Sequence, residues 1–190
     1  ARTWRVTVDA TGDAPTIQAA IDSCAAGDSV VVGPGRYTWT GQGTGNEMGF
    51  IRMMRGQERI TLCSELGRDA TILDAEYRSR VVYLQGMNFA TVDGFTITRG
   101  DAPDWGDRCG GGLFTHIPRD RVRNCAFVAN RGEFGGGVSC VVNDGYFYLE
   151  NCVFTGNTVT RYGGAVGLAN GTGSIHVRDC TMTGNAAGLD

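Results

Sequence analysis

Side chains suited to metal or acid–base chemistry are concentrated in one segment of this 190-residue chain. Asp101, Asp104 and Asp107 recur at three-residue intervals, Arg108 follows directly, and His116 is close in sequence. Carboxylate oxygens are the ligands that calcium prefers, and a basic residue opposite bound calcium could abstract a proton. The spacing matches no known calcium loop. A solvated surface loop is therefore the favoured interpretation, and a calcium site at the three aspartates is the alternative.

Aromatic side chains suggest a second kind of chemistry, which is stacking on sugar rings. Trp39, Trp105, Tyr146, Tyr148 and Tyr162 could lie on the outside of the fold. Side chains alternate between the two faces of a strand, so neighbouring members of this set should differ in exposure. Exposed aromatic residues on a flat sheet could equally pack against a neighbouring subunit, and both alternatives stay open.

The elements that would position these side chains come from an internal repeat. One sequence repeat occurs three times, as Val122–Asn130, Leu149–Asn157 and Val177–Asn185, and a weaker match to it is Val92–Gly100. A glycine-rich phrase recurs between the copies, as Gly110–Leu113, Gly135–Val138 and Gly163–Val166. A fixed period in this range is the signature of a repeat architecture.

Each repeat predicts short strands rather than a helix. Val122, Cys125 and Phe127 fit two strands that meet at a corner at Asn124, because asparagine tolerates the left-handed backbone of a sharp corner. Gly94 occupies the matching corner upstream. With one more strand from each glycine phrase, a repeat forms one coil of a right-handed parallel β-helix, an all-β solenoid. Equivalent residues should then stack in ladders, which are Cys125, Cys152 and Cys180; Phe127, Phe154 and Met182; and Asn130, Asn157 and Asn185.

The chain is expected to form a single domain, residues 1–190, that is closed at one end. Residues 1–28 predict a strand at Trp4–Val8 and a capping α-helix at Ala14–Ala26, stopped by Gly27. Residues 29–190 predict about five coils, and no comparable element closes the last of them. The first strands of the coils are expected near Val30, Ile51, Val82, Leu113, Val138 and Ala165.

Two known families resemble these patterns. The phrases Phe127–Asn130 and Phe154–Asn157, each followed by its glycine phrase, resemble the repeats of polymorphic outer-membrane protein passenger domains. Those domains are secreted β-helices implicated in adhesion, and the match covers roughly the last 90 residues. The run Val6–Tyr37 resembles the opening of pectin-lyase-like β-helices. The resemblance implies a secreted, bacterial-type cell-surface protein. Gly100, which lacks the asparagine, and Met182, which replaces phenylalanine, depart from the pattern.

The resemblance to β-helix proteins also makes an enzyme a hypothesis to test, because this fold hosts polysaccharide lyases, hydrolases and esterases. Hydrolase sites of this kind need grouped aspartates and a Gly-His-Gly, but His116 and His176 have no glycine neighbours. Asp74 and Asp93 are isolated, whereas a methylesterase site needs a fixed block of residues. All 17 basic residues are arginine, which excludes any mechanism that needs lysine. We therefore nominate no catalytic residue and no cofactor, and we expect a protein that is not an enzyme.

The amino-acid composition limits the kinds of partner and of covalent cross-link that the chain can have. The net charge of −3 argues against nucleic acid, and no apolar run is long enough to cross a bilayer. Seven cysteines is an odd number, and their spacing is that of the repeat rather than of zinc sites. Cys109 and Cys140 flank glycine phrases one coil apart, so a disulfide between them is possible in a secreted protein.

These observations leave three hypotheses for function. The first is a non-enzymatic extracellular β-solenoid that associates with itself, end to end through the uncapped last coil, into a filament or surface layer. The second is an adhesin or carbohydrate-binding fragment of a longer surface protein, with surface glycans as partners. The third, and least favoured, is a polysaccharide lyase-type enzyme.

Overall fold

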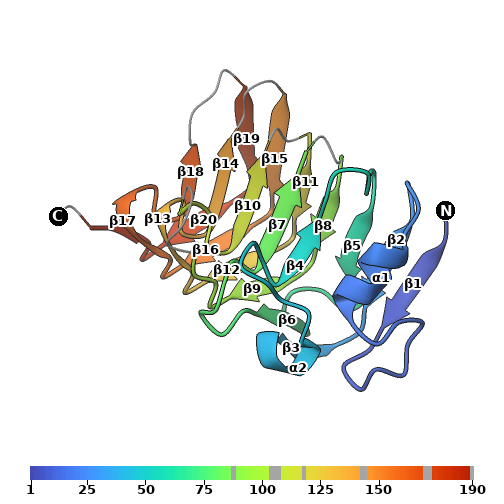
Figure 1. Cartoon of the computed structure of the whole chain (residues 1–190). Coiled ribbons are helices and arrows are strands. Elements are labelled where there is room, and N and C mark those ends of the chain that lie inside the picture. The colour runs from blue at the N-terminus through green and yellow to red at the C-terminus, as the bar shows by residue number, and fades with distance from the viewer. Residues whose placement is uncertain (87–88, 103–107, 117–118, 142–144, 169–172, 189–190) are drawn as a thin grey trace.

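Short strands wind into a right-handed parallel β-helix of about six turns, which confirms the fold expected from the repeat (Figure 1). The computed structural model describes residues 1–86, 89–102, 108–116, 119–141, 145–168 and 173–188. All strand pairs within the long sheets are parallel, and consecutive members of a sheet come from consecutive coils. The first strand β1 and the last strand β21 lie at opposite ends of the molecule (Figure 1).

The strands form three long sheets and one short sheet, named A to D here. Sheet A contains β1 (Thr3–Val6), β2 (Ser29–Val32), β5 (Thr61–Ser64), β8 (Thr91–Asp93), β11 (Arg121–Arg123), β15 (Tyr146–Glu150) and β19 (Ser174–Arg178). Sheet B contains β3 (Gly35–Thr38), β6 (Thr71–Asp74), β9 (Thr96–Thr98), β12 (Ala126–Val128), β16 (Val153–Thr155) and β20 (Thr181–Thr183). Sheet C contains β4 (Ile51–Met53), β7 (Val82–Gln85), β10 (Leu113–His116), β14 (Val138–Val141) and β18 (Val166–Leu168). Sheet D contains β13 (Arg131–Phe134), β17 (Thr158–Tyr162) and β21 (Ala186–Ala187).

The corner between sheets A and B has the backbone that the sequence predicts. Asn124, Asn151 and Asp179 have φ angles of 55°, 51° and 52°, and Gly94 has a φ angle of 78° at the equivalent position. Asparagine and aspartate tolerate this left-handed conformation because their short polar side chains can bond locally. Asn151 does so by donating from Nδ2 to Oδ1 of Asn124 at 2.8 Å.

The core consists of side chains that stack from coil to coil. Phe127 pairs with Phe154 in register, and Phe154 pairs with Met182. The two phenylalanine rings are 4.9 Å apart and nearly parallel. Cys125 and Cys152 are buried in the next ladder, whereas Cys180 at its end is partly exposed. Burial of one coil therefore depends on the presence of the following one.

Hydrogen bonds explain the repeated asparagine. Asn157 Oδ1 accepts from both the backbone N–H and Nδ2 of Asn130 at 3.0 Å, and Asn185 Oδ1 accepts in the same way from Asn157. Each Nδ2 also donates to a backbone carbonyl oxygen, such as that of Phe127. Asn130 and Asn157 are fully buried, so this chain of bonds satisfies polar groups that water cannot reach.

The N-terminal helix is shorter than predicted. Helix α1 covers Ile17–Ser23, because the Thr16 hydroxyl accepts the N–H of Ala19 and the Cys24 N–H turns back to Ile21. Its buried face packs against β1, β2 and β4 at the first coil. A second short helix, α2 (Trp39–Gln42), was not predicted, and Gly43 ends it with a φ angle of 63°.

The expected first strands do not all belong to one sheet. Val30 lies in sheet A, whereas Ile51, Val82, Leu113 and Val138 stack in sheet C. The wrong assignment of Val30 has a simple cause, since a short apolar run looks the same in any sheet of a solenoid.

The last described coil is exposed. Val177 is 45% exposed and Met182 is 46% exposed, whereas their counterparts Val122 and Phe127 are fully buried. Within the described residues, neither helix has the length and apolar character needed to span a membrane.

Candidate functional site: a charged groove beside sheet D

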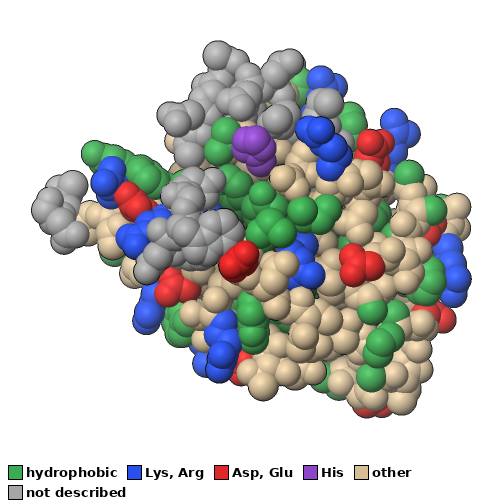
Figure 2. Space-filling view, in the orientation of Figure 1, with side chains coloured by type: hydrophobic (Ala, Val, Ile, Leu, Met, Phe, Trp, Pro, Cys, Tyr) green, Lys and Arg blue, Asp and Glu red, His purple; other side chains and the backbone are tan. Residues whose placement is uncertain are grey.

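A groove of about 360 Å³ lies between sheet D and the segment that precedes β10. Figure 2 shows basic and acidic side chains next to one another on the side of the molecule where Figure 1 places β13 and β17. The groove is lined by Asp101, Ala102, Arg108, Arg131, Gly132, Glu133, Thr158, Val159 and Thr160. Its lining therefore contains two arginines, two carboxylates and two hydroxyl groups.

Small residues let the backbone segments approach closely at the floor of the groove. A Cβ atom on Gly132 would lie 3.2 Å from the Arg108 carbonyl oxygen and 3.7 Å from Cβ of Ala102. Backbone hydrogen bonds hold these segments together, with Glu133 donating to Arg108 at 2.8 Å and Ala102 donating to Arg131 at 3.2 Å. The backbone at Ala102, Arg108 and Glu133 is thus held by hydrogen bonds between these segments.

The charged residues of the groove differ in their partners. Glu133 accepts from Arg161 at 2.6 Å, so its charge is already balanced. Arg131 is exposed, and its guanidinium lies over the ring of Tyr77 with 4.1 Å between the Cζ atom and the ring centroid. None of the described side chains forms an ion pair with Arg131. Its guanidinium therefore differs from that of Arg161, which is paired with a carboxylate.

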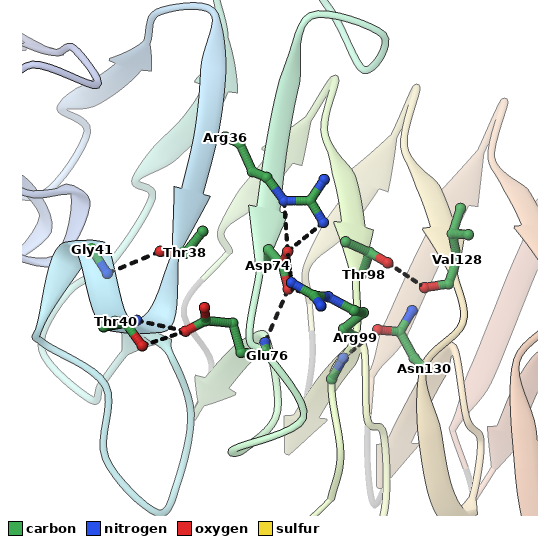
Figure 3. A network of polar contacts seen from close by, with 11 residues as sticks. Arg36, Thr38, Thr40, Gly41, Asp74, Glu76, Thr98, Arg99, Val128 and Asn130 are labelled. Carbon is green, nitrogen blue, oxygen red and sulfur yellow. Dashed lines mark hydrogen bonds and ion pairs between the residues drawn. The ribbon is translucent and has the colours of Figure 1, made fainter.

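A second polar cluster lies on the outer face of sheet B, near the turn that carries Tyr77 (Figure 3). The side chain of Asp74 is fully buried between two arginines. Its Oδ2 accepts from Arg36 Nε at 2.7 Å and from Arg99 Nη2 at 2.5 Å, and its Oδ1 accepts from Arg99 Nε at 2.8 Å. Burial by itself would raise the pKa of Asp74. The hydrogen bonds from Arg99, the Glu76 backbone and Arg36 outweigh burial and lower the pKa below its ordinary value.

Asp74 is therefore a saturated structural carboxylate and not a general base. Asp93 is also paired, and its carboxylate accepts from Arg123 Nε at 2.8 Å and from Asn124 Nδ2 at 2.7 Å. The two aspartates lie in different sheets, β6 and β8, so the structure does not bring them together.

The acidic segment that the sequence singled out borders the groove. Asp101 and Arg108 both line it, while Asp104, Trp105 and Asp107 lie outside the described residues. No group of histidine, cysteine and acidic residues that could hold a metal ion occurs within the described ranges. The calcium alternative at the three aspartates stays an untested prediction.

The two histidines lie in different sheets. His116 ends β10 in sheet C, in register with Gln85 and Val141. His176 lies in β19 of sheet A, where its ring stacks on Tyr148 at 4.9 Å. The other aromatic candidates differ in exposure: Tyr146 and Tyr162 are exposed, whereas Trp39 packs partly against the core.

The disulfide considered between Cys109 and Cys140 does not form. Cys140 stacks on Thr115 in the preceding coil, whereas Cys109 bridges to Phe134, so the two cysteines occupy different register positions. Cys140 carries a buried thiol, and burial raises its pKa to about 12. Both cysteines flank glycine phrases in the sequence, but they do not lie above one another in adjacent coils.

Sequence reasoning missed Arg131, Glu133 and Tyr77. A usable signal was present for the first two, because they break the repeat. After Asn130 the chain reads Arg-Gly-Glu, whereas it reads Thr-Val-Thr after Asn157 and Ala-Ala-Gly after Asn185. Charged residues where sister repeats carry small neutral ones indicate a local function rather than a requirement of the fold.

Comparison with known proteins supports the fold. No family model matches the chain, and no curated protein matches it. Its structure is similar to the crystal structure of pectate lyase Pel9A, with a TM-score of 0.56 and 16% sequence identity over 95% of this chain. The chain spans about half the length of that solved structure, 47%. The similarity shows a parallel β-helix of the pectin-lyase-like type.

Proposed function

We propose that this chain is a non-enzymatic, extracellular β-helix that binds an acidic polysaccharide in the groove beside sheet D. The observation that carries the proposal is the exposed guanidinium of Arg131, which has no ion-pair partner among the described residues and lies over an aromatic ring. Arginine binds carboxylates through two parallel hydrogen bonds, so a uronate carboxylate is a suitable ligand.

The rest of the groove suits the hydroxyl groups of a sugar. Thr158 and Thr160 offer hydroxyl groups along β17, and the carboxylate of Glu133 can accept hydrogen bonds while paired with Arg161. The similarity to a pectate lyase is a supporting observation, because polygalacturonate is an acidic polysaccharide. Such polymers occur outside cells, which is why the proposal places the chain in the extracellular space.

The test is calorimetric titration of the purified chain with oligogalacturonates. We expect Arg131→Ala to weaken binding about ten- to a hundredfold, which corresponds to a lost charged hydrogen bond of about 1.5–3 kcal/mol. Added salt should weaken the wild-type affinity as well. Arg5→Ala is the matched control, because Arg5 is an exposed arginine in sheet A that pairs with Glu65.

Two results would count against acidic-polysaccharide binding. One is equal affinity for oligogalacturonate and for a neutral oligosaccharide of the same length. The other is an equal effect of Arg131→Ala and Arg5→Ala. Release of products that absorb as unsaturated sugars, abolished by a chelator, would instead show lyase activity and would overturn the non-enzymatic part of the proposal.

A second candidate function, self-association through the last described coil, has its own supporting observation. In earlier coils the backbone N–H groups of Asn151, Gly156 and Asn157 donate to the next coil. Their counterparts Asp179, Gly184 and Asn185 have no acceptor among the described residues. Open donors beside the exposed Met182 form an edge that a second copy could extend.

Light scattering coupled to size-exclusion chromatography tests this assembly. A mass that grows with protein concentration, and that Met182→Arg restores to the monomer, is the expected result, because a charge in that layer opposes stacking. A monomer at every concentration would exclude self-association and would leave the groove proposal untouched.

A further inference from the structure

The turn Ala75–Arg78 has a backbone that its sequence does not favour. Arg78 donates its N–H to the Ala75 carbonyl oxygen at 2.9 Å, and the two central residues, Glu76 and Tyr77, have φ angles of 53° and 58°. Positive φ at both central positions is the pattern of a type I′ turn, which prefers Asn-Gly. Side chains with a Cβ atom are strained in this conformation. Such strain persists only where the surroundings impose it, and it clusters at functional sites.

Polar contacts impose this conformation on the turn (Figure 3). Glu76 donates its N–H to Asp74 Oδ1 at 3.0 Å, and its carboxylate accepts from the backbone N–H and hydroxyl of Thr40 at 2.8 Å and 2.6 Å. Tyr77 donates its N–H to the Arg99 carbonyl oxygen at 2.6 Å. Asp74 is itself held between Arg36 and Arg99. The turn is therefore anchored to its own coil through Asp74 and to the coils on either side through Thr40 and Arg99.

The strained turn places the ring of Tyr77 beneath Arg131. The Arg131 guanidinium lies 4.1 Å from the ring centroid, which is within the range of a cation–π interaction. At the other end of the side chain, the Arg131 backbone is fixed by donating its N–H to Gly100 at 2.8 Å. A long, otherwise mobile arginine is thus held at both ends at the edge of the groove.

We propose that Tyr77 is the positioning residue for Arg131, and that the Asp74 cluster serves to keep the Glu76–Tyr77 turn in its strained form. The inference rests on the proposed function of the groove. A Tyr77 that holds Arg131 in place reduces the ordering cost of binding an anion. A turn with only a structural role would be more stable with Asn-Gly at its centre. Measuring the melting temperature and the ligand affinity of the same variants therefore separates the two roles.

The central experiment is the double variant Glu76→Asn/Tyr77→Gly, which supplies the favoured residues and removes the ring. We expect its melting temperature to stay close to that of the wild type, because relief of backbone strain offsets the loss of the two bonds from Thr40. We also expect its affinity for oligogalacturonate to fall about fivefold, because the cation–π contact is lost. Unchanged affinity in this variant would overturn the positioning role.

Single variants resolve the contribution of the ring. Tyr77→Phe keeps the aromatic face and should bind within about twofold of the wild type, whereas Tyr77→Leu should reproduce most of the loss. Glu76→Asn is the matched control for the double variant, because it loses the same two bonds from Thr40 but keeps the ring. Equal affinities for Tyr77→Phe and Tyr77→Leu would show that the ring does not act on Arg131.

Failure of the positioning role can be told apart from failure of the groove. If the wild type does not bind oligogalacturonate, the proposed function fails. The arrangement of Arg131 can still be read from its side-chain Nε–H resonance by NMR, assigned with Arg131→Lys. A ring-current shift present in the wild type and in Tyr77→Phe, and absent in Tyr77→Leu, would support the positioning role. An identical resonance in all three proteins would overturn it.

Discussion

Asp120 is a buried carboxyl group that lies outside the groove and the Asp74 cluster. Its side chain is enclosed where the loop before β11 meets the neighbouring coils, and its oxygens accept the N–H of Ala90 at 2.8 Å and the hydroxyl of Thr115 at 2.9 Å. Burial raises its pKa to about 6, because the two neutral donors compensate only in part for the loss of water.

This pKa has a defined consequence for stability. The folded pKa lies above the ordinary value of 3.8, so the folded state binds more protons between these two values. Stability that is fully present below about pH 4 is therefore lost as the pH rises through about 6. The loss is on the order of 3 kcal/mol, since one pKa unit corresponds to about 1.4 kcal/mol.

We predict that Asp120→Asn removes most of this decline. Urea unfolding at a series of pH values should show the variant gaining stability over the wild type as the pH rises from about 4 to about 7. Asp69→Asn, at an exposed aspartate, is the control and should follow the wild-type curve. Parallel curves for wild type and Asp120→Asn would contradict the prediction.

At the scale of single elements, the glycine phrases show why some glycines are required and others are not. Gly135 and Gly156 have similar φ angles, 57° and 62°. A Cβ atom on Gly135 would lie 2.3 Å from the Val138 carbonyl oxygen, whereas one on Gly156 would meet nothing within 4 Å. Ala129, the equivalent of Gly156 in the preceding coil, already adopts a φ angle of 53°.

The expected result is a large difference between two chemically identical substitutions. Gly156→Ala should cost about 1 kcal/mol of unfolding free energy, which is the cost of a left-handed alanine. Gly135→Ala should cost about 3 kcal/mol or more, because the backbone must also move away from Val138. Thermal and urea unfolding of the two variants measure this difference, and equal losses would show that the glycine phrase does not pack as described.

The elements that repeat could be predicted from the sequence, and those that occur once could not. The corner at Asn124 and the stacking of Phe127 on Phe154 follow from residues that recur with one period. Helix α2 has four residues and no periodicity, so nothing marks it in advance. The ends of α1 were misjudged because Thr16 caps its start later than Pro15 suggests, and Cys24 ends it earlier than Gly27 suggests.

The candidate site was hidden for a different reason. Tyr77 follows β6 and Arg131 follows β12, two coils further on in sheet B, so no periodic pattern in the sequence pairs them. The Glu76–Tyr77 turn runs against local preference, so propensity reasoning predicts the wrong conformation there. The acidic segment was found because its charges are adjacent in sequence, but its relation to Arg131 requires the winding of the solenoid.

At the scale of the whole molecule, the two ends of the solenoid differ. The buried face of α1 packs against the first coil, while the last described coil exposes Met182 and Val177. Each coil contacts chiefly its two neighbours, so stability is approximately a sum of coil and interface contributions. The groove lies toward the exposed end, beside β13 and β17, and any partner that covers the last coil would come close to it (Figure 1).

The asparagine ladder also bears on the order in which the coils can form during synthesis. Asn130 donates to Asn157, which donates to Asn185, so the acceptors for these two residues are translated after them. Helix α1, which packs against the first described coil, precedes these residues in the chain and leaves the ribosome before them. A nascent chain can therefore add these coils one after another while synthesis continues, and the newest of them lacks its neighbour until the next is made.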